Sequence, residues 1–384
     1  MARAPTTVRP LTRRITLVSP YALSVFGGVQ EQVLAMSREL ARRGDDVLIV
    51  APDRLDVAHY DTPATLVRLG RVVSTPANGS RAPLALSPRA SQQASKAIDE
   101  FTPDVVHFHE PFAPLLPWAT LRRHRWASVA TFHRGGSGPA LRLSEPLLHR
   151  LSRGLDVSAA VSERAADTVR GVTTLAPKVL FNGFETERFR ASGRTRGADI
   201  VLCVVGRLEA RKGVEVAINA VRAHNARDGS TWQLVVVGDG PERARLEALS
   251  AHDENVTFLG AASDDDKRSL LRRSNVLLAP ALRGESFGLV LLEAMASETA
   301  VVASDIDGYR DAASSHATLF APGDASSLEA AIEHALRTES TRSIADALAH
   351  AQRWSMRQLI DEYEPLYDEA VTVHQRRVAL RGGN

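Results

Sequence analysis

The sequence is short of cysteine, of long hydrophobic runs and of charge of one sign. A single cysteine, Cys203, stands among 384 residues, so no disulfide can form within the chain, which fits a reducing cytoplasm. No stretch approaches the roughly 18 consecutive apolar residues of a membrane-spanning helix. Lysine and arginine number 47 against 45 aspartate and glutamate, and this net charge of +2 gives no ground for nucleic-acid binding. We therefore expect a cytoplasmic protein whose only membrane contact would be peripheral, on the inner face of the cell membrane.

The amino terminus is basic, as the start of a signal peptide is. The apolar run that follows it, Ile15–Val18, ends before Pro20 and is too short for the hydrophobic region of such a peptide. We therefore expect residues 1–12 to be a frayed tail.

What the chain does contain is an alternation of short apolar runs with helical patterns. Such runs between helices are typical of parallel strands buried on both faces, which predicts doubly wound α/β domains. The runs are Ile15–Val18, Val47–Val50, Val105–Phe108, Ser128–Phe132, Val157–Val161, Ile200–Val205, Leu234–Val237, Val256–Leu259, Val276–Ala279 and Ala300–Ala303. Residues 190–199, rich in Gly, Arg and Ser, interrupt the series and predict a linker. We expect domains at 1–190 and 191–353 with a ligand cleft between them, and a helix at 354–384.

The most informative segment is Arg283–Glu298. A polar loop leads from an apolar run into a helical pattern, with Ser286 at the expected N-cap. A helix N-terminus after a loop that contains glycine suits a phosphate, because its free N–H groups and its dipole favour an anion. Two carboxylates, Glu285 and Glu293, flank that end. Since carboxylates repel a phosphate, we expect these two to accept hydrogen bonds from sugar hydroxyls.

A second segment in the same half of the chain places cations after a strand. Arg207 follows the apolar run 200–205, and Arg211 and Lys212 follow in a short loop before Gly213 and an apolar helix. Three cations at one sheet edge repel one another unless an anion joins them. A diphosphate would be that anion, because arginine offers a fork of donors and lysine a point charge. A solvated basic loop is the alternative.

The first half of the chain offers a glycine pair and three histidines at predicted strand ends. Gly27 and Gly28 would let the backbone approach a ligand, although they do not form the G-x-G-x-x-G pattern of a dinucleotide site. His107 and His109 lie on one predicted strand and His133 ends the next, so all three fall near the carboxyl edge of the sheet. No further ligand is placed to complete a metal site with His107 and His109, and we expect structural or acceptor-lining roles for them.

Together these motifs resemble those of the retaining, nucleotide-sugar-dependent glycosyltransferases of family four, which have the GT-B fold. The resemblance rests on Glu285-x7-Glu293, on G-R-x5-K-G at 206–213, on A-T-F-H ending at His133 and on G-G-V-Q at 27–30. It implies two Rossmann-like domains facing a cleft, with protein cations in place of a metal and with no cofactor. The catalytic residues that it implies are His133, Glu285, Arg207 and Lys212. The donor-binding residues are Gly28, Arg207, Lys212, Asp264, Lys267, Glu285, Ser286, Phe287, Gly288, Leu289 and Glu293. The acceptor-binding residues are Tyr21, Gly27, Gln30 and Asn78.

The resemblance also assigns roles. It implies that Glu285 and His133 position the transferred sugar, that Glu293 contacts the ribose, and that N–H groups after Phe-Gly hold the diphosphate. Asp264 and Lys267 match positions that contact guanine in the mannosyltransferase branch, which implies GDP-mannose as the donor. The implied route is attack on the face that the diphosphate leaves, with the leaving phosphate taking the acceptor proton.

The acceptor is less clearly indicated. Within the family, the chain is most similar to the phosphatidylinositol α-mannosyltransferases of actinobacteria, which implies a lipid acceptor. It departs from that branch at Ala77, where the branch has tyrosine, and at Pro83, where it has an arginine for the inositol phosphate. The following helix, 87–101, carries only Arg89 and Lys96 as cations. A soluble acceptor such as a small metabolite, a sugar phosphate or a glucan, with UDP-sugar as a further donor, is therefore an alternative. A non-catalytic sugar-nucleotide-binding protein is the alternative of another class.

A segment at 141–155 has the pattern of a basic amphipathic helix that could lie on an anionic membrane. Its apolar face is predicted to hold Leu147, Leu148, Leu151 and Leu155, with Arg150 and Arg153 toward the other side. The alternative is that these leucines cover the sheet of the first domain.

Overall fold

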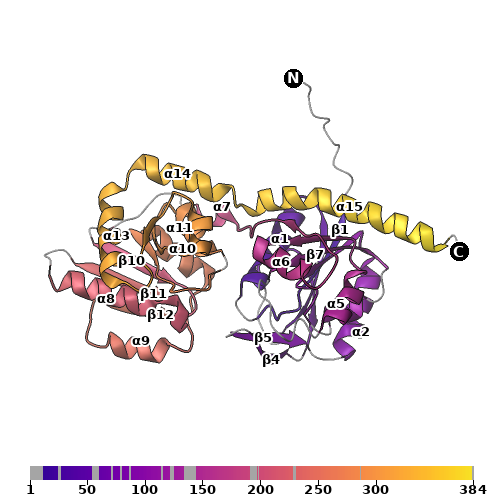
Figure 1. Ribbon diagram of the computed structural model, residues 1–384, viewed down its shortest axis with the longest axis horizontal. Helices are drawn as coiled ribbons and strands as arrows, with labels where there is room; N and C mark the ends of the chain where they lie inside the picture. The colour runs from indigo at the N-terminus through magenta and orange to yellow at the C-terminus, as the bar shows by residue number, and fades with distance from the viewer. Residues whose placement is uncertain are drawn as a thin grey trace, which may run out of the picture. The chain divides into compact units, whose positions relative to one another are not determined.

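The computed structural model describes residues 12–24, 27–53, 60–70, 72–77, 80–85, 88–113, 116–121, 125–133, 144–190, 197, 199–227, 231–285 and 287–382. The chain forms two compact units, Met1–Gly183 together with Met356–Asn384, and Phe184–Ser355. The sequence placed the domain boundaries after residues 190 and 353, whereas the structure divides after 183 and 355. Each unit is an α/β domain with helices against a parallel sheet (Figure 1). The predicted fold class, two doubly wound α/β domains, is confirmed.

The first unit is built on a parallel sheet of seven strands in the order β3-β2-β1-β6-β7-β8-β9. Its strands are β1 (Arg14–Val18), β2 (Asp46–Pro52), β3 (Thr65–Leu69), β6 (Val105–His109), β7 (Ala127–Phe132), β8 (Val157–Ala160) and β9 (Lys178–Val179). Alternate side chains of a strand point to opposite faces, so Ile15 and Leu17 enter one core and Val18 the other. Because both faces are buried, the central strands are mostly apolar, with a few buried polar side chains such as His107 and His109.

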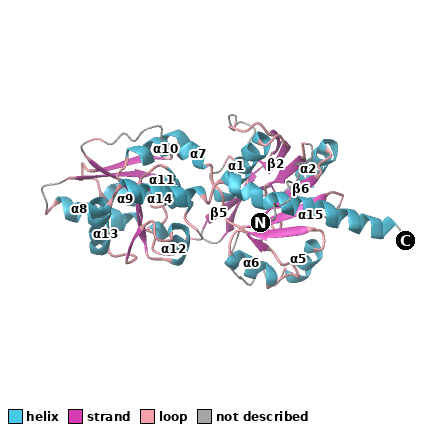
Figure 2. Ribbon diagram, turned by 90° about the horizontal axis from the view of Figure 1, so that it is seen from above, coloured by secondary structure: helices cyan, strands magenta, loops and turns pink. Residues whose placement is uncertain are grey.

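Helices cover both faces of this sheet, as Figure 2 shows. One core receives apolar side chains from α1 (Gly28–Arg42) and α15 (Met356–Gly382). The other receives them from α2 (Pro88–Phe101), α3 (Leu116–Leu121) and α6 (Glu163–Arg170). The C-terminal helix therefore completes the core of the unit that contains the N-terminal strand.

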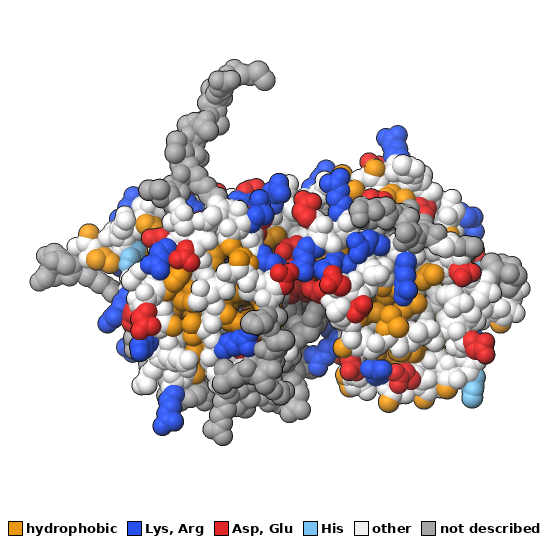
Figure 3. Space-filling view, turned by 180° about the vertical axis from the view of Figure 1, so that it is seen from behind, with side chains coloured by type: hydrophobic (Ala, Val, Ile, Leu, Met, Phe, Trp, Pro, Cys, Tyr) orange, Lys and Arg blue, Asp and Glu red, His pale blue; other side chains and the backbone are white. Residues whose placement is uncertain are grey.

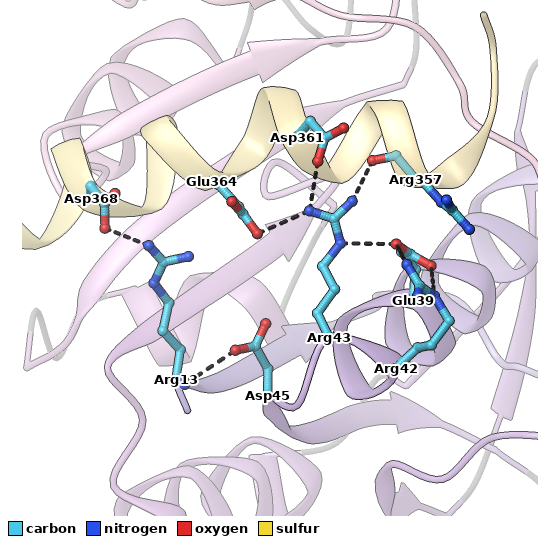
Figure 4. A network of polar contacts seen from close by, with 9 residues as sticks. All are labelled: Arg13, Glu39, Arg42, Arg43, Asp45, Arg357, Asp361, Glu364 and Asp368. Atoms are coloured by element: carbon cyan, nitrogen blue, oxygen red, sulfur yellow. Dashed lines mark hydrogen bonds and ion pairs between the residues drawn. The ribbon is translucent and has the colours of Figure 1, made fainter. Parts of the chain in front are cut away.

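Ionic contacts add to this attachment of α15 (Figure 4). The guanidinium of Arg43 in the α1–β2 turn lies 2.8 Å from Glu39, 2.7 Å from Asp361 and 2.9 Å from Glu364. Burial lowers the pKa of Arg43, but hydrogen bonds to these three carboxylates outweigh burial and raise it. The Arg43 side chain is 10% exposed, so its ion pairs are screened less than those on the open surface.

The second unit has a parallel sheet of six strands in the order β12-β11-β10-β13-β14-β15. The strands are β10 (Ile200–Val205), β11 (Trp232–Val237), β12 (Val256–Gly260), β13 (Val276–Ala279), β14 (Ala300–Ser304) and β15 (Thr318–Phe320). One core is formed with α8 (Val214–Asn225), α9 (Arg243–Leu249) and α13 (Ala325–Thr338). The other is formed with α7 (Thr186–Phe189), α10 (Asp264–Arg273), α11 (Leu289–Ala296), α12 (Asp307–Ala313) and α14 (Thr341–Gln352).

Five strands were not predicted from the sequence. Three of them, β3, β9 and β15, lie at sheet edges, where a strand has one neighbour and stays partly exposed, so no continuous apolar run marks it. The other two, β4 (Val72–Ala77) and β5 (Ser80–Ala85), form an antiparallel ribbon of their own. Asn78, predicted to bind the acceptor, falls between them and outside the described residues, as does most of the predicted linker at 190–199.

The described surface carries both signs of charge. On the face drawn in Figure 3, acidic and basic side chains lie interspersed, as the net charge of +2 leads one to expect. Among the described helices, none has both the length and the apolar character needed to cross a bilayer.

Candidate functional site

The carboxyl edge of the second sheet carries a chain of alternating charges. From the loop after β10 and the short 3-10 helix η1 (Ala210–Lys212), Arg207 lies 3.2 Å from Glu209, and Arg211 lies 2.8 Å from Glu209. Glu285, in the loop after β13, then contacts Arg211 at 2.6 Å and Lys212 at 2.8 Å. From the sequence we expected the three cations at this edge to repel one another unless an anion joins them. Glu209 and Glu285 supply two negative charges from the protein itself.

These side chains differ in how freely they can meet a ligand. The Arg207 side chain is 50% exposed, whereas Lys212 is 19% and Glu285 is 12% exposed. Arg207 and Lys212 also line one small pocket of about 10 Å³ together with Tyr309 of α12 and Val290 of α11. A larger cavity of about 490 Å³ lies at the amino ends of β14 and β15 and contains none of the predicted site residues.

Helix α11 begins at Leu289, and its N-cap is Gly288, in a left-handed conformation with φ of 83°. The prediction that Ser286 caps this helix was therefore wrong, and Ser286 itself lies outside the described residues. A left-handed residue cannot belong to the helix, so the helix cannot start before it. A Cβ on Gly288 would approach Cδ1 of buried Tyr309 to 2.6 Å, which explains why a glycine is needed here. The first free N–H groups of α11 thus follow the Phe287-Gly288 pair, where the sequence placed the phosphate.

Glu293, further along α11, is buried and paired with α10. Its Oε1 lies 3.0 Å from Nζ of Lys267, and both side chains are less than a tenth exposed, at 7% and 8%. Lys267 also lies 3.8 Å from Asp264 and over the ring of Phe189, at 5.2 Å. The residues predicted to contact the ribose and the base are therefore neighbours within this unit.

In the first unit, the loop between β1 and α1 is held by Gln30. This residue is 7% exposed, and its amide donates to the carbonyl of Ala22 at 3.3 Å. Gly27 is the N-cap of α1 and Gly28 its first residue, with open space around the latter. Tyr21 is 9% exposed. Gln30 therefore supports the loop whose glycines were predicted to face a ligand.

The three histidines predicted at the sheet edge form one stack at the ends of β6 and β7. The ring centroids of His107 and His109 are 4.6 Å apart and those of His109 and His133 are 5.3 Å apart. Burial lowers the pKa of His107 to about 3 and that of His133 to about 4, and it lowers the pKa of His109 well below its usual range. All three rings are therefore neutral at pH 7.

Two sequence families cover most of this chain. Residues 26–188 match the family described as Glycosyltransferase Family 4, and residues 185–351 match the one described as Glycosyl transferases group 1. The phosphatidyl-myo-inositol mannosyltransferase of Mycolicibacterium smegmatis is 33% identical over 96% of this chain and 98% of its own. The chain belongs to the family 4 glycosyltransferases. A second relative of this glycosyltransferase, the phosphatidyl-myo-inositol mannosyltransferase of Propionibacterium freudenreichii, is 34% identical over 78% of each chain.

Solved structures agree on the fold of the glycosyltransferase. A glycosyltransferase from Rickettsia africae has a TM-score of 0.73 at 16% identity, covering 94% of this chain and 99% of the other. The Anabaena protein HepE, in complex with UDP and glucose, has a TM-score of 0.66 at 17% identity and covers 92% and 99%. At these identities the similarity concerns the fold alone, and it is the GT-B fold.

Some side chains of the glycosyltransferase that touch predicted site residues escaped the sequence analysis. Glu209 alternates with two arginines, and that spacing was a usable signal. Tyr309, Thr131 and Asn182 carried no such signal in the sequence, because they reach the site residues only through the tertiary fold.

His224, Glu329 and Glu333 form the kind of group that can hold a metal ion, within 4.8 Å of one another among the described residues. Arg227 already pairs with Glu329 there.

Proposed function

We propose that this glycosyltransferase moves mannose from GDP-mannose to a lipid-linked acceptor such as phosphatidylinositol, with retention of configuration. The observation that carries the proposal is a cluster of Arg207, Lys212 and Glu285 beside the N-terminus of α11. We call it the compensated cluster, because carboxylates of the protein balance the charge of its cations. The names of the relatives support mannose and a phosphatidylinositol acceptor. In this proposal Gly28 and Leu289 border the donor diphosphate, and Tyr21, Gly27, Gln30 and Asn78 border the acceptor.

The cations and the helix end have one task in this reaction. As the bond between sugar and diphosphate breaks, negative charge grows on the departing oxygen, and Arg207, Lys212 and the N–H groups of Leu289 and Val290 stabilise it. Removing one such preorganised donor costs about 3–4 kcal/mol of transition-state energy in comparable sites. The acceptor hydroxyl attacks the face that the diphosphate leaves, so no carboxylate is required as a nucleophile. The departing phosphate takes the proton of this hydroxyl, so no carboxylate is required as a base.

The role of Glu285 is tested against its neighbour. Glu285→Gln should reduce kcat far more than GDP affinity, because the carboxylate orients the transferred sugar. Glu209→Gln is the matched control: Glu209 also pairs with two cations, Arg207 and Arg211, but has no proposed sugar contact. Transfer kinetics and calorimetric GDP titration are measured on both variants. Equal loss of kcat in the two would reduce Glu285 to an ion-pair partner.

The donor base is tested by calorimetry with GDP and UDP. Asp264 and Lys267 should make GDP bind more tightly, and UDP binding as tightly as GDP would refute the GDP assignment. Lys267→Met should weaken GDP binding more than UDP binding. Because Lys267 is held against Glu293 at 3.0 Å, and Glu293 is proposed to contact the ribose, part of the loss should be shared by both nucleotides.

A soluble acceptor is the second candidate, and one observation favours it. The cations of α2 and its neighbourhood are partly neutralised, since Lys96 lies 3.6 Å from Glu100 and Arg125 lies 3.5 Å from Asp99. An anionic lipid headgroup would therefore gain little electrostatic attraction from this surface. Incubation with GDP- and UDP-sugars and with lipid, sugar-phosphate and glucan acceptors, followed by mass spectrometry, separates the candidates. NMR of the product gives its anomeric configuration, and nucleotide binding without any product would leave the non-catalytic alternative.

Peripheral membrane contact is proposed at α5 (Glu145–Ser152), with residues 141–143 outside the described part of the chain. Leu148 and Leu151 are buried, so they cover the domain core, while Leu147 is 36% exposed. Burial of Leu148, Leu151 and Leu155 agrees with the alternative that these leucines cover the first domain, and Leu147 is the exception. Leu147, Arg150 and Arg153 remain exposed. Each of the two arginines would contribute about 1 kcal/mol of binding free energy near an anionic membrane surface. Co-sedimentation should show binding to anionic vesicles that weakens with salt. Arg150→Glu combined with Arg153→Glu should abolish it, and no binding by the native chain refutes the contact.

A further inference from the structure

His133 is held by partners from two segments of the first unit, at the end of β6 and at Asn182. Its Nε2 lies 3.0 Å from Nδ1 of His109, and its backbone N–H donates to Oε1 of Glu110 at 2.5 Å. Asn182 forms a side-chain hydrogen bond with His133. Glu110 is buried and has a φ of 48°, an unfavourable conformation for a residue with a side chain. Such strain persists only where the surroundings impose it, so the position of His133 is closely determined.

The direction of the bond between the two rings follows from the other nitrogen of His109. Nε2 of His109 is buried and has no hydrogen-bond partner among the residues that the structure describes. If Nδ1 of His109 were the acceptor, the proton of this neutral ring would sit on Nε2 and leave a buried N–H unpaired. Unpaired buried N–H groups are rarer than unpaired buried acceptors. Nδ1 of His109 therefore carries the proton and donates it to Nε2 of His133. The proton of neutral His133 is then on Nδ1, where the amide oxygen of Asn182 can accept it.

His109 itself is fixed by a second neighbour, His107. It stacks on His107 with an angle of 17° between the ring planes. His107 is fully buried, with Nε2 2.7 Å from the hydroxyl of Thr131 and Nδ1 3.0 Å from the hydroxyl of Tyr367. Thr131 in turn lies 2.7 Å from the hydroxyl of Tyr363. Both tyrosines belong to α15, so the C-terminal helix closes the floor of the stack.

We propose that His109 is a positioning residue that fixes the Nδ1–H tautomer and the ring orientation of His133. His133 then takes part in the transfer as a neutral ring and does not take the acceptor proton, because the lone pair of Nε2 is engaged by His109 and its one N–H by Asn182. This inference rests on the proposed role of His133 in the reaction. It adds a second residue, His109, which acts on the reaction through His133 and touches no substrate.

Three substitutions of His109 separate hydrogen bonding from packing. The amide nitrogen of asparagine can take the place of Nδ1, whereas that of glutamine takes the place of Nε2. His109→Asn should therefore retain kcat. His109→Gln and His109→Phe should lower kcat, although phenylalanine preserves the stacking on His107. We expect kcat to fall on the order of 10–100-fold in the Gln and Phe variants, as when partners that orient metal-binding histidines are lost. The KM for donor and the calorimetric affinity for GDP should stay unchanged.

The tautomer of His133 is read independently of activity. Nitrogen-15 NMR of histidine-labelled full-length protein, with the His133 signals identified through a His133→Gln sample, should show Nδ1–H in the native chain and in His109→Asn. The Nε2–H form should emerge in His109→Phe. An Nε2–H tautomer in the native chain, or the same tautomer in every variant, overturns the inference. So does recovery of kcat by glutamine as well as by asparagine. If the native chain transfers no sugar, the proposed function fails, while the NMR result still decides whether His109 controls His133.

Discussion

Replacing Gly288 by alanine should disturb the second unit through a clash with one buried side chain next to the proposed donor site. Gly288 has a φ of 83°, and its added Cβ would lie 2.6 Å from Cδ1 and 2.7 Å from Cε1 of Tyr309. Tyr309 is 2% exposed and belongs to the core between α11 and the sheet, so its ring has no room to retreat. Gly284 provides a control in the same loop. It has a similar φ of 78°, but its added Cβ would meet nothing nearer than 3.8 Å.

The magnitude follows from two separable effects. A left-handed conformation costs a residue with a Cβ about 1–2 kcal/mol relative to glycine, and both variants incur this cost. Forcing a methyl into a filled core costs a further 1–3 kcal/mol or so, which applies to Gly288 alone. We therefore expect Gly284→Ala to lower the free energy of unfolding of the second unit by about 1–2 kcal/mol and Gly288→Ala by about 2–5 kcal/mol.

Urea denaturation followed by hydrogen exchange of α11 and α12 measures this difference for the second unit, without assuming that the whole chain unfolds in one step. A Tyr309→Leu background removes the ring edge that the methyl would meet. There the extra cost of Gly288→Ala should disappear, leaving only the backbone effect. Equal costs for the two glycines, or an extra cost that persists without the ring, would refute the steric argument. Gly288→Ala should also weaken GDP binding, because it displaces the first N–H groups of α11.

Three further predictions concern buried charge. Lys267→Met leaves the carboxylate of Glu293 buried without its cation, so urea denaturation should show a loss of about 3–5 kcal/mol, part of which Glu293→Leu restores; no loss would contradict the pairing. Because burial lowers the pKa of His107 to about 3, its contribution is complete above its ordinary pKa near 6.5 and declines as the pH falls. The unfolding free energy should therefore fall toward pH 5, with about 1.4 kcal/mol per pH unit from this histidine in addition to the contributions of His109 and His133; His107→Asn should reduce the total slope by that share, and an unchanged slope would count against burial as its origin. Arg43→Met should destabilise the first unit by about 1–3 kcal/mol in thermal denaturation, and Lys178→Met, which breaks an exposed pair, by less than about 1 kcal/mol; similar losses would show that burial does not distinguish them.

The central strands were predictable because burial on both faces leaves a mark on the sequence. The run Ile200–Val205 became β10 with the predicted bounds, and its neighbours were found within a residue or two at each end. Edge strands such as β3 carry no such mark, since Arg68 and other polar side chains are tolerated where one face is wet. Local composition therefore identified the middle of each sheet and missed three of the four edge strands, β12 being the edge strand that it found.

The site was predictable in its residue types and less so in its contacts. Ser286 was taken as an N-cap from its chemistry, yet Gly288 ends the loop because Tyr309, 21 positions later, occupies the space that a side chain would need. The charge of the cluster was misjudged in the same way. Arg207, Arg211 and Lys212 were counted as cations, whereas Glu285 approaches two of them only when the loop after β13 is folded. Contacts between residues far apart in sequence decide such points, and one sequence does not contain them.

The compensated cluster also bears on how the proposed donor would bind. Had the cations been bare, a diphosphate would relieve their mutual repulsion on arrival. With Glu209 and Glu285 in place, the diphosphate instead competes for cations that already have partners. Lys212 is mostly buried and fixed by Glu285 at 2.8 Å, so it can act without moving, as a preorganised charge does. Arg207 is half exposed and held by Glu209 at 3.2 Å, so it is the cation that can turn toward an incoming phosphate. Under this proposal, Lys212 defines where the diphosphate sits, and Arg207 closes on it after it arrives.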